Sequence, residues 1–393
     1  MCCRAKLPWS LRIRLFALLS VSSLVSCAPA LSIPYRALWK TERFAHVEFT
    51  LYRSEVGFSE LHSEWNDLLQ RSRIDTIFLT WEWQSTWWRH FGASRGLLYL
   101  LAARVSGRLI GLLPLYESST DGRVNIQVVG CIEVSDYLDL IVEAGQEEVV
   151  YTALIAWLAG PEAPAWDVVD LCNQPAASFA HTRLPELVRE AGWTAEVVQE
   201  DVCPAIELPR GEQPADSVGG WEAYLEKLDK KERHEIRRKL RRMEREAPGY
   251  QVRLVEDSEQ LEVEVARFVD LHRLSSKAKD QFMTEGMQEF FAAVANALAG
   301  NGWLQISFLE IGERAVASYF CFDYRGEILV YNSGYDPQAS PHLSAGWVLL
   351  ARLIQRAIAT GHSRFDFLQG NEDYKYRFGG VDSPIYRTLI QRA

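Results

Sequence analysis

The segment from Asp366 to Gly380 holds the densest set of side chains that could do acid–base chemistry. It reads DFLQGNEDYKYRFGG and places Glu372, Tyr374 and Lys375 closely behind an apolar strand. Ligands of α/β sheets bind at the carboxyl ends of strands, so polar residues that appear there abruptly are candidates for a site. A charged surface loop is the competing interpretation, and composition alone slightly favours it.

A second segment leads from Tyr331 through small and polar residues to Gly346, at the start of a predicted helix. Asn332 lies in the preceding strand, and Ser344 and Ala345 stand directly before the helix or in its first turn. Small residues here let backbone N–H groups approach a phosphate, and the helix dipole favours the anion. The segment matches neither the P-loop nor the G-x-G-x-x-G fingerprint, so the pattern alone is a weak signal.

Two isolated residues could also take part in chemistry. His272 ends an apolar helix, where a lone histidine is more often structural, so it ranks below Glu372 as a candidate base. Cys321 lies inside an apolar strand, and core packing explains it better than a role as nucleophile. We find no cluster with metal-ligand spacing and therefore predict no metal.

One order of elements occurs twice along the chain, which predicts a duplicated α/β fold. Each copy has a strand, a turn, a returning strand, a further strand, a helix and a last strand. The first copy is predicted at residues 96–104, 109–116, 137–142, 147–158 and 166–171, and the second at 302–311, 315–322, 328–332, 345–359 and 364–368.

A connection rich in proline, glycine and charge at residues 209–214 separates the two copies. We therefore predict an N-terminal extension at residues 1–43, a first half at 44–210 and a second half at 211–393. A single long helix is predicted at 221–246, and two more follow Ser258 and Thr284, whose hydroxyls suit N-caps. The aromatic cluster at residues 81–91 is interpreted as core packing.

The predicted long helix carries a dense row of lysines and arginines between residues 227 and 245. A solvated helix face is the default interpretation. The alternative is a docking surface for an anion, such as donor phosphates, a nucleotide-linked sugar, aminoacyl-tRNA or the inner membrane surface. The net charge of −10 argues against a protein whose whole surface binds nucleic acid, and we predict no DNA partner.

Length and composition fit an ordinary folded protein of two domains or one duplicated domain. The chain has 393 residues, of which 48% are hydrophobic and 24% charged, so disordered and collagen-like classes are excluded. The seven cysteines are scattered, lack C-x-x-C spacing and favour a reducing compartment.

The first residues conflict with that compartment, because basic residues precede an apolar run that ends near Cys27 and resembles a secretory or lipoprotein signal. The run is shorter than the roughly 20 residues that a membrane span needs. We narrowly prefer a start site placed too far upstream. The expected location is the cytoplasm, with peripheral contact to the inner membrane and export left open.

Three stretches resemble one known family in order and spacing: KKERHEIRRKLRRMER at residues 230–245, Leu271-His272, and the segment around Asp366. The family is the branch of bacterial GNAT-superfamily proteins labelled as cellulose-biosynthesis-associated acetyltransferases, related to the Fem-type aminoacyl transferases. The resemblance covers residues 221–379 well, whereas 44–208 match mainly in layout. It implies two tandem GNAT-like halves, each a mixed, mostly antiparallel sheet flanked by helices.

The resemblance also implies where an acyl-coenzyme A donor would bind. In GNAT proteins the donor pyrophosphate lies on a loop that enters a helix, and this position falls on Ser344, Ala345 and Gly346. The usual Q/R-x-x-G-x-G/A signature is not intact here. The closing motif of the family reads like DFLRGDExYKxRFG, and this chain departs from it at Gln369 and Asn371.

Roles are assigned on this resemblance. Glu372 is the predicted base, Tyr374 a proton donor or positioning group, and His272 a further candidate base. The predicted cofactor-binding residues are Asn332, Ser344, Ala345, Gly346 and Lys375, and the predicted substrate-binding residues are Asp366, Gly370 and Arg377.

The leading hypothesis is a cytoplasmic N-acyltransferase that moves an acetyl or other acyl group from acyl-coenzyme A to an amine of a small molecule or a cell-envelope polysaccharide precursor. A Fem-type transferase that uses aminoacyl-tRNA is the close alternative, kept open by the basic helix. A non-catalytic assembly factor for envelope polysaccharide is motivated by the missing glycine signature. A secreted lipoprotein rests on Cys27 alone.

Overall fold

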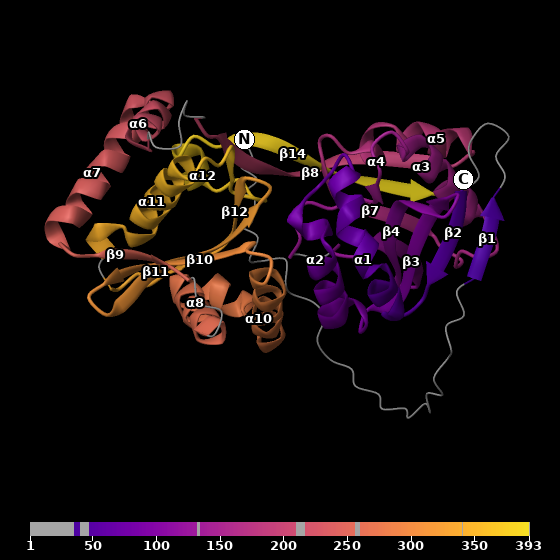
Figure 1. Ribbon diagram of the computed structural model, residues 1–393, viewed down its shortest axis with the longest axis horizontal. Coiled ribbons are helices and arrows are strands. Elements are labelled where there is room, and N and C mark those ends of the chain that lie inside the picture. Colours follow the sequence, from indigo (N-terminus) through magenta and orange to yellow (C-terminus); the bar gives the residue numbers. More distant parts are fainter. Residues whose placement is uncertain are drawn as a thin grey trace, which may run out of the picture.

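The computed structural model describes residues 35–39, 47–131, 134–209, 217–255, 260–339 and 341–392. Most of the predicted N-terminal extension lies outside these ranges, as does the predicted N-cap Ser258. Figure 1 shows two lobes side by side, one built by the first half of the chain and one by the second, with long strands passing between them.

The strands of both halves join in one sheet. The first half contributes β1 (Tyr35–Trp39), β2 (Val47–Tyr52), β3 (Gly96–Val105), β4 (Arg108–Thr120), β5 (Arg123–Val128), β6 (Ile141–Val142), β7 (Val168–Pro175) and β8 (Thr194–Glu207). The second half contributes β9 (Gln251–Leu254), β10 (Leu304–Ile311), β11 (Arg314–Tyr324), β12 (Glu327–Tyr335), β13 (Arg364–Asp366) and β14 (Val381–Gln391). Their order is β1-β2-β3-β4-β5-β7-β14-β8-β13-β12-β11-β10-β9, and β6 pairs with β4.

The pairing pattern is the same in the two halves, which confirms the duplicated α/β fold. In the first half β2, β3, β4 and β5 are antiparallel, and β5 then pairs in parallel with β7. In the second half β9, β10, β11 and β12 are antiparallel, and β12 pairs in parallel with β13. A helix connects each parallel pair, as a parallel crossover requires.

The last strand of each half pairs with strands of the other half. β14 lies between β7 and β8, so a strand from the end of the chain is central to the sheet of the first half. β8 in turn pairs with β13 of the second half. The two lobes are therefore tied together by backbone hydrogen bonds.

Helices cover both faces of this sheet (Figure 1). The first half has α1 (Val56–Arg71), α2 (Trp81–Trp87), α3 (Glu147–Ala159), α4 (Phe179–Thr182) and α5 (Leu184–Glu190), with short helical turns at Ile77–Leu79 and Trp88–Gly92. The second half has α6 (Ser217–Lys227), α7 (Lys230–Glu246), α8 (Leu261–Ser275), α9 (Lys277–Phe282), α10 (Glu285–Ala299), α11 (Ala345–Ala359) and α12 (Asp373–Arg377), with a turn at Pro341–Leu343. In the second half α8 and α10 pack on one face of the sheet and α6, α7 and α11 on the other.

The two halves also share a hydrophobic core. The fully buried ring of Trp83 in α2 lies 5.7 Å from Phe290 of α10 and 5.7 Å from Phe322 of β11, both edge to face. The interpretation of the aromatic cluster as core packing is thereby confirmed for Trp83 and Trp87, which are both completely buried. Edge-to-face aromatic pairs add to the burial of apolar area at this junction.

Two predicted elements are wrong. The single helix predicted at 221–246 is two helices, because Asp229 has extended backbone angles and forms the N-cap of α7. Aspartate is a preferred N-cap residue and so marks the break in the sequence, although the Asp229 side chain makes no capping hydrogen bond. The strand predicted at 137–142 is mostly loop, and only Ile141 and Val142 pair with β4. The position next to β4 that corresponds to β12 is occupied by β5 instead.

Two further observations bear on the predicted elements. The strand β1 falls inside the segment predicted as an extension and pairs with β2 along its backbone. The helix predicted at 345–359 has the same bounds as α11, and the predicted N-cap Thr284 accepts a hydrogen bond from the backbone N–H of Met287. The boundary at residues 210/211 stays a prediction.

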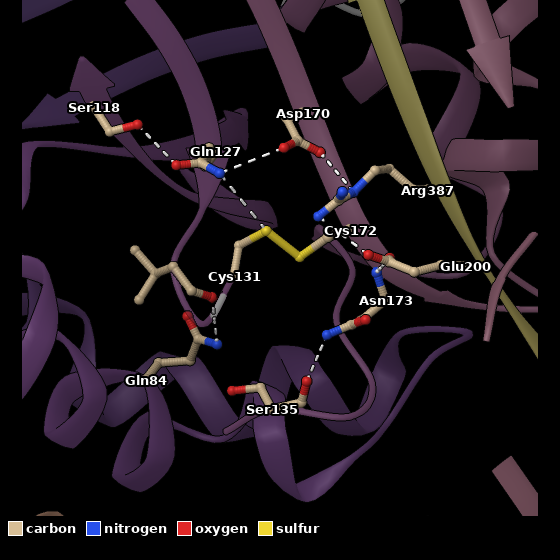
Figure 2. Close-up of a disulfide and its surroundings, with 11 residues drawn as sticks. Gln84, Ser118, Gln127, Cys131, Ser135, Asp170, Cys172, Asn173, Glu200 and Arg387 are labelled. Carbon is tan, nitrogen blue, oxygen red and sulfur yellow. Dashed lines mark hydrogen bonds and ion pairs between the residues drawn. A yellow bond between two sulfur atoms is a disulfide. The ribbon is translucent and has the colours of Figure 1, made fainter. Parts of the chain in front are cut away.

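A disulfide joins Cys131 and Cys172 in the first half (Figure 2). Cys131 follows β5 and Cys172 lies in β7, beyond the point where these two parallel strands stop pairing at Gln127 and Asp170. Disulfides persist mainly in oxidising compartments, so this bond runs against the reducing compartment that the cysteine pattern favoured. Cys203 and Cys321 are buried free thiols. Within the described ranges, no helix is long and apolar enough to cross a membrane.

We expect Ile390→Ala to lower the free energy of unfolding by about 2–5 kcal/mol, because it removes buried methyl groups from the central strand β14. Ile390 is 1% exposed, whereas Val381 at the start of β14 is 72% exposed. Val381→Ala is the matched control and should change the free energy by less than about 0.5 kcal/mol. Urea unfolding followed by fluorescence and circular dichroism measures both. Equal effects of the two substitutions would contradict the central position of β14.

We expect the full-length protein, digested without reduction, to yield one peptide pair linked through Cys131 and Cys172. Mass spectrometry before and after reduction detects this pair. Cys203 and Cys321 should react with a thiol reagent only after unfolding, because both are completely buried. Recovery of Cys131 as a free thiol from protein kept under air would contradict the disulfide.

Candidate active site

A cavity opens in the second half where the parallel strands β12 and β13 separate. The two strands pair only where Glu327–Leu329 of β12 lie beside Arg364–Asp366 of β13. Just beyond, a bulge in β12 makes Tyr331 an extra residue between the pairs that Val330 and Asn332 form with β11. Bulges bend a strand and redirect its side chains, and they are frequent beside active sites. The cavity between the separating strands is called the split cavity. It has a volume of about 320 Å³ and is lined by residues 330–333 and 367–369, among others.

A second cavity, of about 600 Å³, lies at the start of α11 and is called the α11 cavity. Ser344, Ala345, Gly346 and Trp347 line it, together with Lys239 of α7. No side chain caps the first turn of α11, so its leading N–H groups are available to an anion. A Cβ atom built on Gly346 would meet nothing within 4 Å, so the backbone is open here.

The two cavities adjoin, because Lys279, Ser333 and Tyr374 line both. A long molecule lying with one end at α11 can therefore reach the split cavity with its other end. The junction brings the two segments singled out in the sequence, the one after β13 and the one before α11, to one place.

The three predicted catalytic residues, Glu372, Tyr374 and His272, all line the split cavity. Glu372 is the N-cap residue of α12; its side chain is 58% exposed and forms an ion pair at 2.9 Å with Nζ of Lys375. Burial raises the pKa of Tyr374 well above its ordinary value. Tyr374 therefore keeps its proton at neutral pH, and its hydroxyl can donate a hydrogen bond.

His272 is almost completely buried, and its protonation follows from one contact. Nδ1 lies 3.1 Å from the backbone carbonyl oxygen of Ser333. A carbonyl only accepts hydrogen bonds, so Nδ1 carries the proton and Nε2 has the lone pair. Burial, followed by the charge of Lys279, lowers the pKa of His272 to about 3. His272 is therefore neutral and a weak base.

Lys375 is a predicted cofactor-binding residue, but its ammonium group is fully hydrogen-bonded within the protein. Its Nζ donates to the carbonyl oxygens of Leu368 at 3.0 Å, Gln369 at 2.8 Å and Gly370 at 3.0 Å, and pairs with Glu372. An ammonium group has three protons, so these acceptors use all of its donors. Lys375 clamps the loop after β13, and its contact with a donor stays a prediction.

Asp366 and Gly370, two of the predicted substrate-binding residues, shape the same loop. Asp366 is buried, and its carboxylate accepts hydrogen bonds from the Leu368 backbone N–H at 2.7 Å and the Tyr137 hydroxyl at 2.9 Å. Gly370 has a φ of +110°, and a Cβ there would meet the Glu372 carboxylate at 2.8 Å, so the position requires glycine.

Arg377, the third predicted substrate-binding residue, faces α7. Its Nε lies 3.0 Å from the carboxylate of Glu232, and its guanidinium stacks on Trp347 at 4.8 Å. None of Asp366, Gly370 and Arg377 is among the residues that line either cavity. Their contact with substrate stays a prediction, and the structure gives each a positioning task. Asn332 lines the split cavity rather than the α11 cavity.

Sequence reasoning missed Lys279, which lines both cavities. Lys279 lies on the short helix α9, which was not predicted from the sequence. The available signal was Ser276, the N-cap residue of α9, whose hydroxyl accepts a hydrogen bond from the Lys279 backbone N–H at 3.2 Å. The Lys279 ammonium donates to the backbone carbonyl and hydroxyl oxygens of Ser333. Burial lowers its pKa to about 8.

Sequence reasoning also missed Asp136, which reaches the split cavity from a loop of the first half. The residue is 9% exposed, and burial raises the pKa of its carboxyl group to about 7, against the lowering effect of Lys375. Nothing in the sequence near Asp136 marks it, because its partners in the site lie more than a hundred residues further along the chain. Throughout the described part of the chain, no His, Cys, Asp and Glu side chains group in a way that could hold a metal ion.

Comparison with known proteins finds a sequence similarity in the second half. Residues 230–376 match the sequence model of the family described as acetyltransferase (GNAT) domain. This stretch runs from α7 into α12 and contains all residues that line the two cavities except Val134 and Asp136, which belong to the first half. The second half is thus similar to GNAT acetyltransferase domains. No curated protein sequence matches the chain. The narrower cellulose-associated branch stays a prediction.

Solved structures resemble nearly the whole chain in fold. FemX is 9% identical with a TM-score of 0.59, covering 83% of this chain and 95% of FemX. A conserved protein of unknown function from Bacteroides thetaiotaomicron is 8% identical with a TM-score of 0.56, covering 87% and 99%. The C-terminal domain of a protein from Agrobacterium fabrum described as a lysylphosphatidylglycerol synthetase is 12% identical with a TM-score of 0.51, covering 86% and 92%. At these identities the likeness concerns the fold alone.

We expect Lys375→Met to lower the free energy of unfolding by about 3 kcal/mol, because it leaves three carbonyl oxygens in the loop after β13 without their donor. Lys277→Met, at an exposed position of α9, is the control and should stay within about 0.5 kcal/mol. Urea unfolding measures both. If Lys375 served only to bind a donor, Lys375→Met would be as stable as the control.

Proposed function

We propose that the protein is an N-acyltransferase that moves an acetyl or other acyl group from acyl-coenzyme A to a primary amine. The observation that carries this proposal is the pair of adjoining cavities. The α11 cavity offers uncapped N–H groups to an anion, and the split cavity holds acid–base side chains. The similarity of residues 230–376 to GNAT acetyltransferase domains supports the same reaction class.

The α11 cavity suits the pyrophosphate of coenzyme A. If Gly346 takes the last position of the GNAT signature, Ser344 takes the place of its first glycine. Ser344 has a φ of +55°, the left-handed conformation that glycine adopts most easily, so the backbone keeps a glycine-like shape without the glycine. Lys239 lies 3.7 Å above the ring of Trp347 and adds positive charge beside the helix start.

The acceptor amine would occupy the split cavity. A base there removes a proton from the acceptor ammonium, and the freed nitrogen lone pair attacks the thioester carbonyl carbon. The C–S bond then breaks, the carbonyl re-forms as an amide, and the thiolate takes up a proton. Tyr374, at the junction of the cavities, is placed to give this proton and to regain one from the acylated nitrogen. Glu372 and His272 are the bases predicted from the sequence.

A small molecule or an envelope polysaccharide precursor is the proposed source of the amine. The cytoplasm is the proposed location, because acyl-coenzyme A is found there. The Cys131–Cys172 disulfide favours an oxidising compartment, so fractionation of cells should accompany the peptide mapping described above.

An aminoacyl-tRNA donor is the second candidate, favoured by the basic helix α7. A hollow on this side of the molecule is lined by Lys230, Lys231, His234 and Glu235 of α7 and by Arg377. A tRNA bound there through its phosphates would dissociate steeply as salt rises. Salt-dependent tRNA binding without acyl-coenzyme A binding would replace the first candidate with the second. Binding of neither donor would favour the non-catalytic assembly factor.

We expect the full-length protein to bind acetyl-coenzyme A with micromolar affinity, about −8 kcal/mol, in isothermal titration. Gly346→Glu should weaken this binding at least tenfold, because a carboxylate at the helix start repels the pyrophosphate while it favours the helix itself. Gly346→Gln is the neutral control of equal size. Equal affinities of the two variants would show that no phosphate binds at the start of α11.

A further inference from the structure

The first half sends one loop, residues 134–140, to the split cavity of the second half. Val134 and Asp136 of this loop line the cavity. Tyr137 donates from its hydroxyl to the carboxylate of Asp366 at 2.9 Å, and Tyr331 donates from its hydroxyl to the Val134 carbonyl oxygen at 3.0 Å. The loop is therefore bonded to the second half on both sides of Asp136.

The same loop is fixed to the first half around the disulfide (Figure 2). The Asn173 amide donates to the Ser135 carbonyl oxygen at 2.6 Å, and the Asn173 carbonyl oxygen accepts from the Leu138 N–H at 2.9 Å. The Trp83 indole donates to the Ser135 hydroxyl at 2.9 Å. Residues on either side of Asp136 thus have little freedom, and its position in the cavity is set in advance.

The Asp136 carboxylate itself receives no hydrogen bond or ion pair from any residue in the described ranges. A carboxylate that is about nine-tenths buried and unpaired costs stability unless a ligand compensates it. The charged groups around it are Lys375, which favours its ionised form, and Asp366, Glu372 and Asp201, which oppose it. The titratable side chains of Cys203 and Tyr331 also lie close enough to interact with it. A cation entering the split cavity would remove this cost.

Each of the other candidate proton acceptors of the cavity is exposed, already bonded or a weak base. Glu372 is more than half exposed and already paired with Lys375. His272 has a pKa lowered to about 3, so a proton transferred to it would be held weakly. Lys279 donates to two oxygens of Ser333. Burial raises the pKa of Asp136 to about 7, near the working pH of a general base. The pKa of Lys279, about 8, is also close, but its ammonium is bonded to Ser333, whereas the Asp136 carboxylate has no partner among the described residues.

We propose that Asp136 binds the ammonium group of the acceptor and takes its proton, so that the first half completes the active site of the second. This inference rests on the proposed function. The carboxylate accepts one proton from R–NH₃⁺ and leaves R–NH₂, whose lone pair forms the new C–N bond. The second proton leaves the nitrogen as the amide forms and goes to the departing thiolate. The acceptor class is accordingly a primary amine that enters as its cation.

The first arm of the test needs no acceptor and follows stability against pH. The pKa of Asp136 is higher in the folded protein than its ordinary value of 3.8, so ionisation destabilises the fold progressively as pH rises from about 4 to about 7. Asp136→Asn cannot ionise. We expect the Tm of this variant, relative to wild type, to increase between pH 5 and pH 8. A difference in Tm that stays constant over this range would overturn the inference.

The second arm measures thiol release from acetyl-coenzyme A with n-butylamine, or with water alone, as acceptor. Wild type should lose activity below about pH 7, and Asp136→Asn should be at least 100-fold slower while binding acetyl-coenzyme A within about twofold of wild type. Asp139→Asn is the matched control and should keep the wild-type rate. Asp139 lies on the same loop and is equally buried, but accepts from the Leu140 N–H and the Tyr151 hydroxyl and lies outside the cavity.

The outcomes separate the inference from the proposed function. An Asp136→Asn protein that binds acetyl-coenzyme A and keeps the wild-type rate and pH profile refutes the role of Asp136 and leaves the acyltransferase standing. A wild-type protein that does not bind acetyl-coenzyme A refutes the proposed function, and the inference falls with it. If the donor binds but neither acceptor reacts, the inference is judged by the first arm, the difference in Tm between Asp136→Asn and wild type from pH 5 to pH 8.

Discussion

Buried backbone N–H and C=O groups need hydrogen-bond partners. The site lies where β12 and β13 separate, and it depends on how this need is met there. Beyond Asp366 the chain no longer pairs with β12 and stays with β8, through the N–H groups of Phe367 and Gly370. The carbonyl oxygens that this leaves unpaired are taken up by the ammonium of Lys375, and the carbonyl of Ser333 on β12 by His272 and Lys279. The split can stay open because side chains replace the missing partners.

The first half has the same topology and uses it differently. β5 and β7 also stop pairing partway, but there the Cys131–Cys172 bond crosses between them (Figure 2). The hydrogen bonds of Asn173 next to this bond hold the loop that reaches the other half. One copy of the duplicated unit thus provides a cavity, and the other provides a rigid support for one of its walls.

The sequence predicts best what depends on neighbouring residues. The apolar period and small starting residues of α11 give its bounds, and Glu372, Tyr374 and His272, which were assigned catalytic roles on the family resemblance, line one cavity. Asp136 and Lys279 could not be predicted, because their importance arises from burial and from contacts across the halves. The break at Asp229 was carried by a local cap signal that the strong helical pattern of its neighbours concealed.

The exchange of last strands has a consequence for how the chain folds as it is synthesised. β14 follows all other strands and helices of the second half, and it fills the gap between β7 and β8. Until the ribosome has released these residues, two long strands of the first half have unpaired edges, which are prone to pair with other chains. The first half therefore cannot complete its sheet before the second half has been made, and the facing edges of β7 and β8 need protection by chaperones until then.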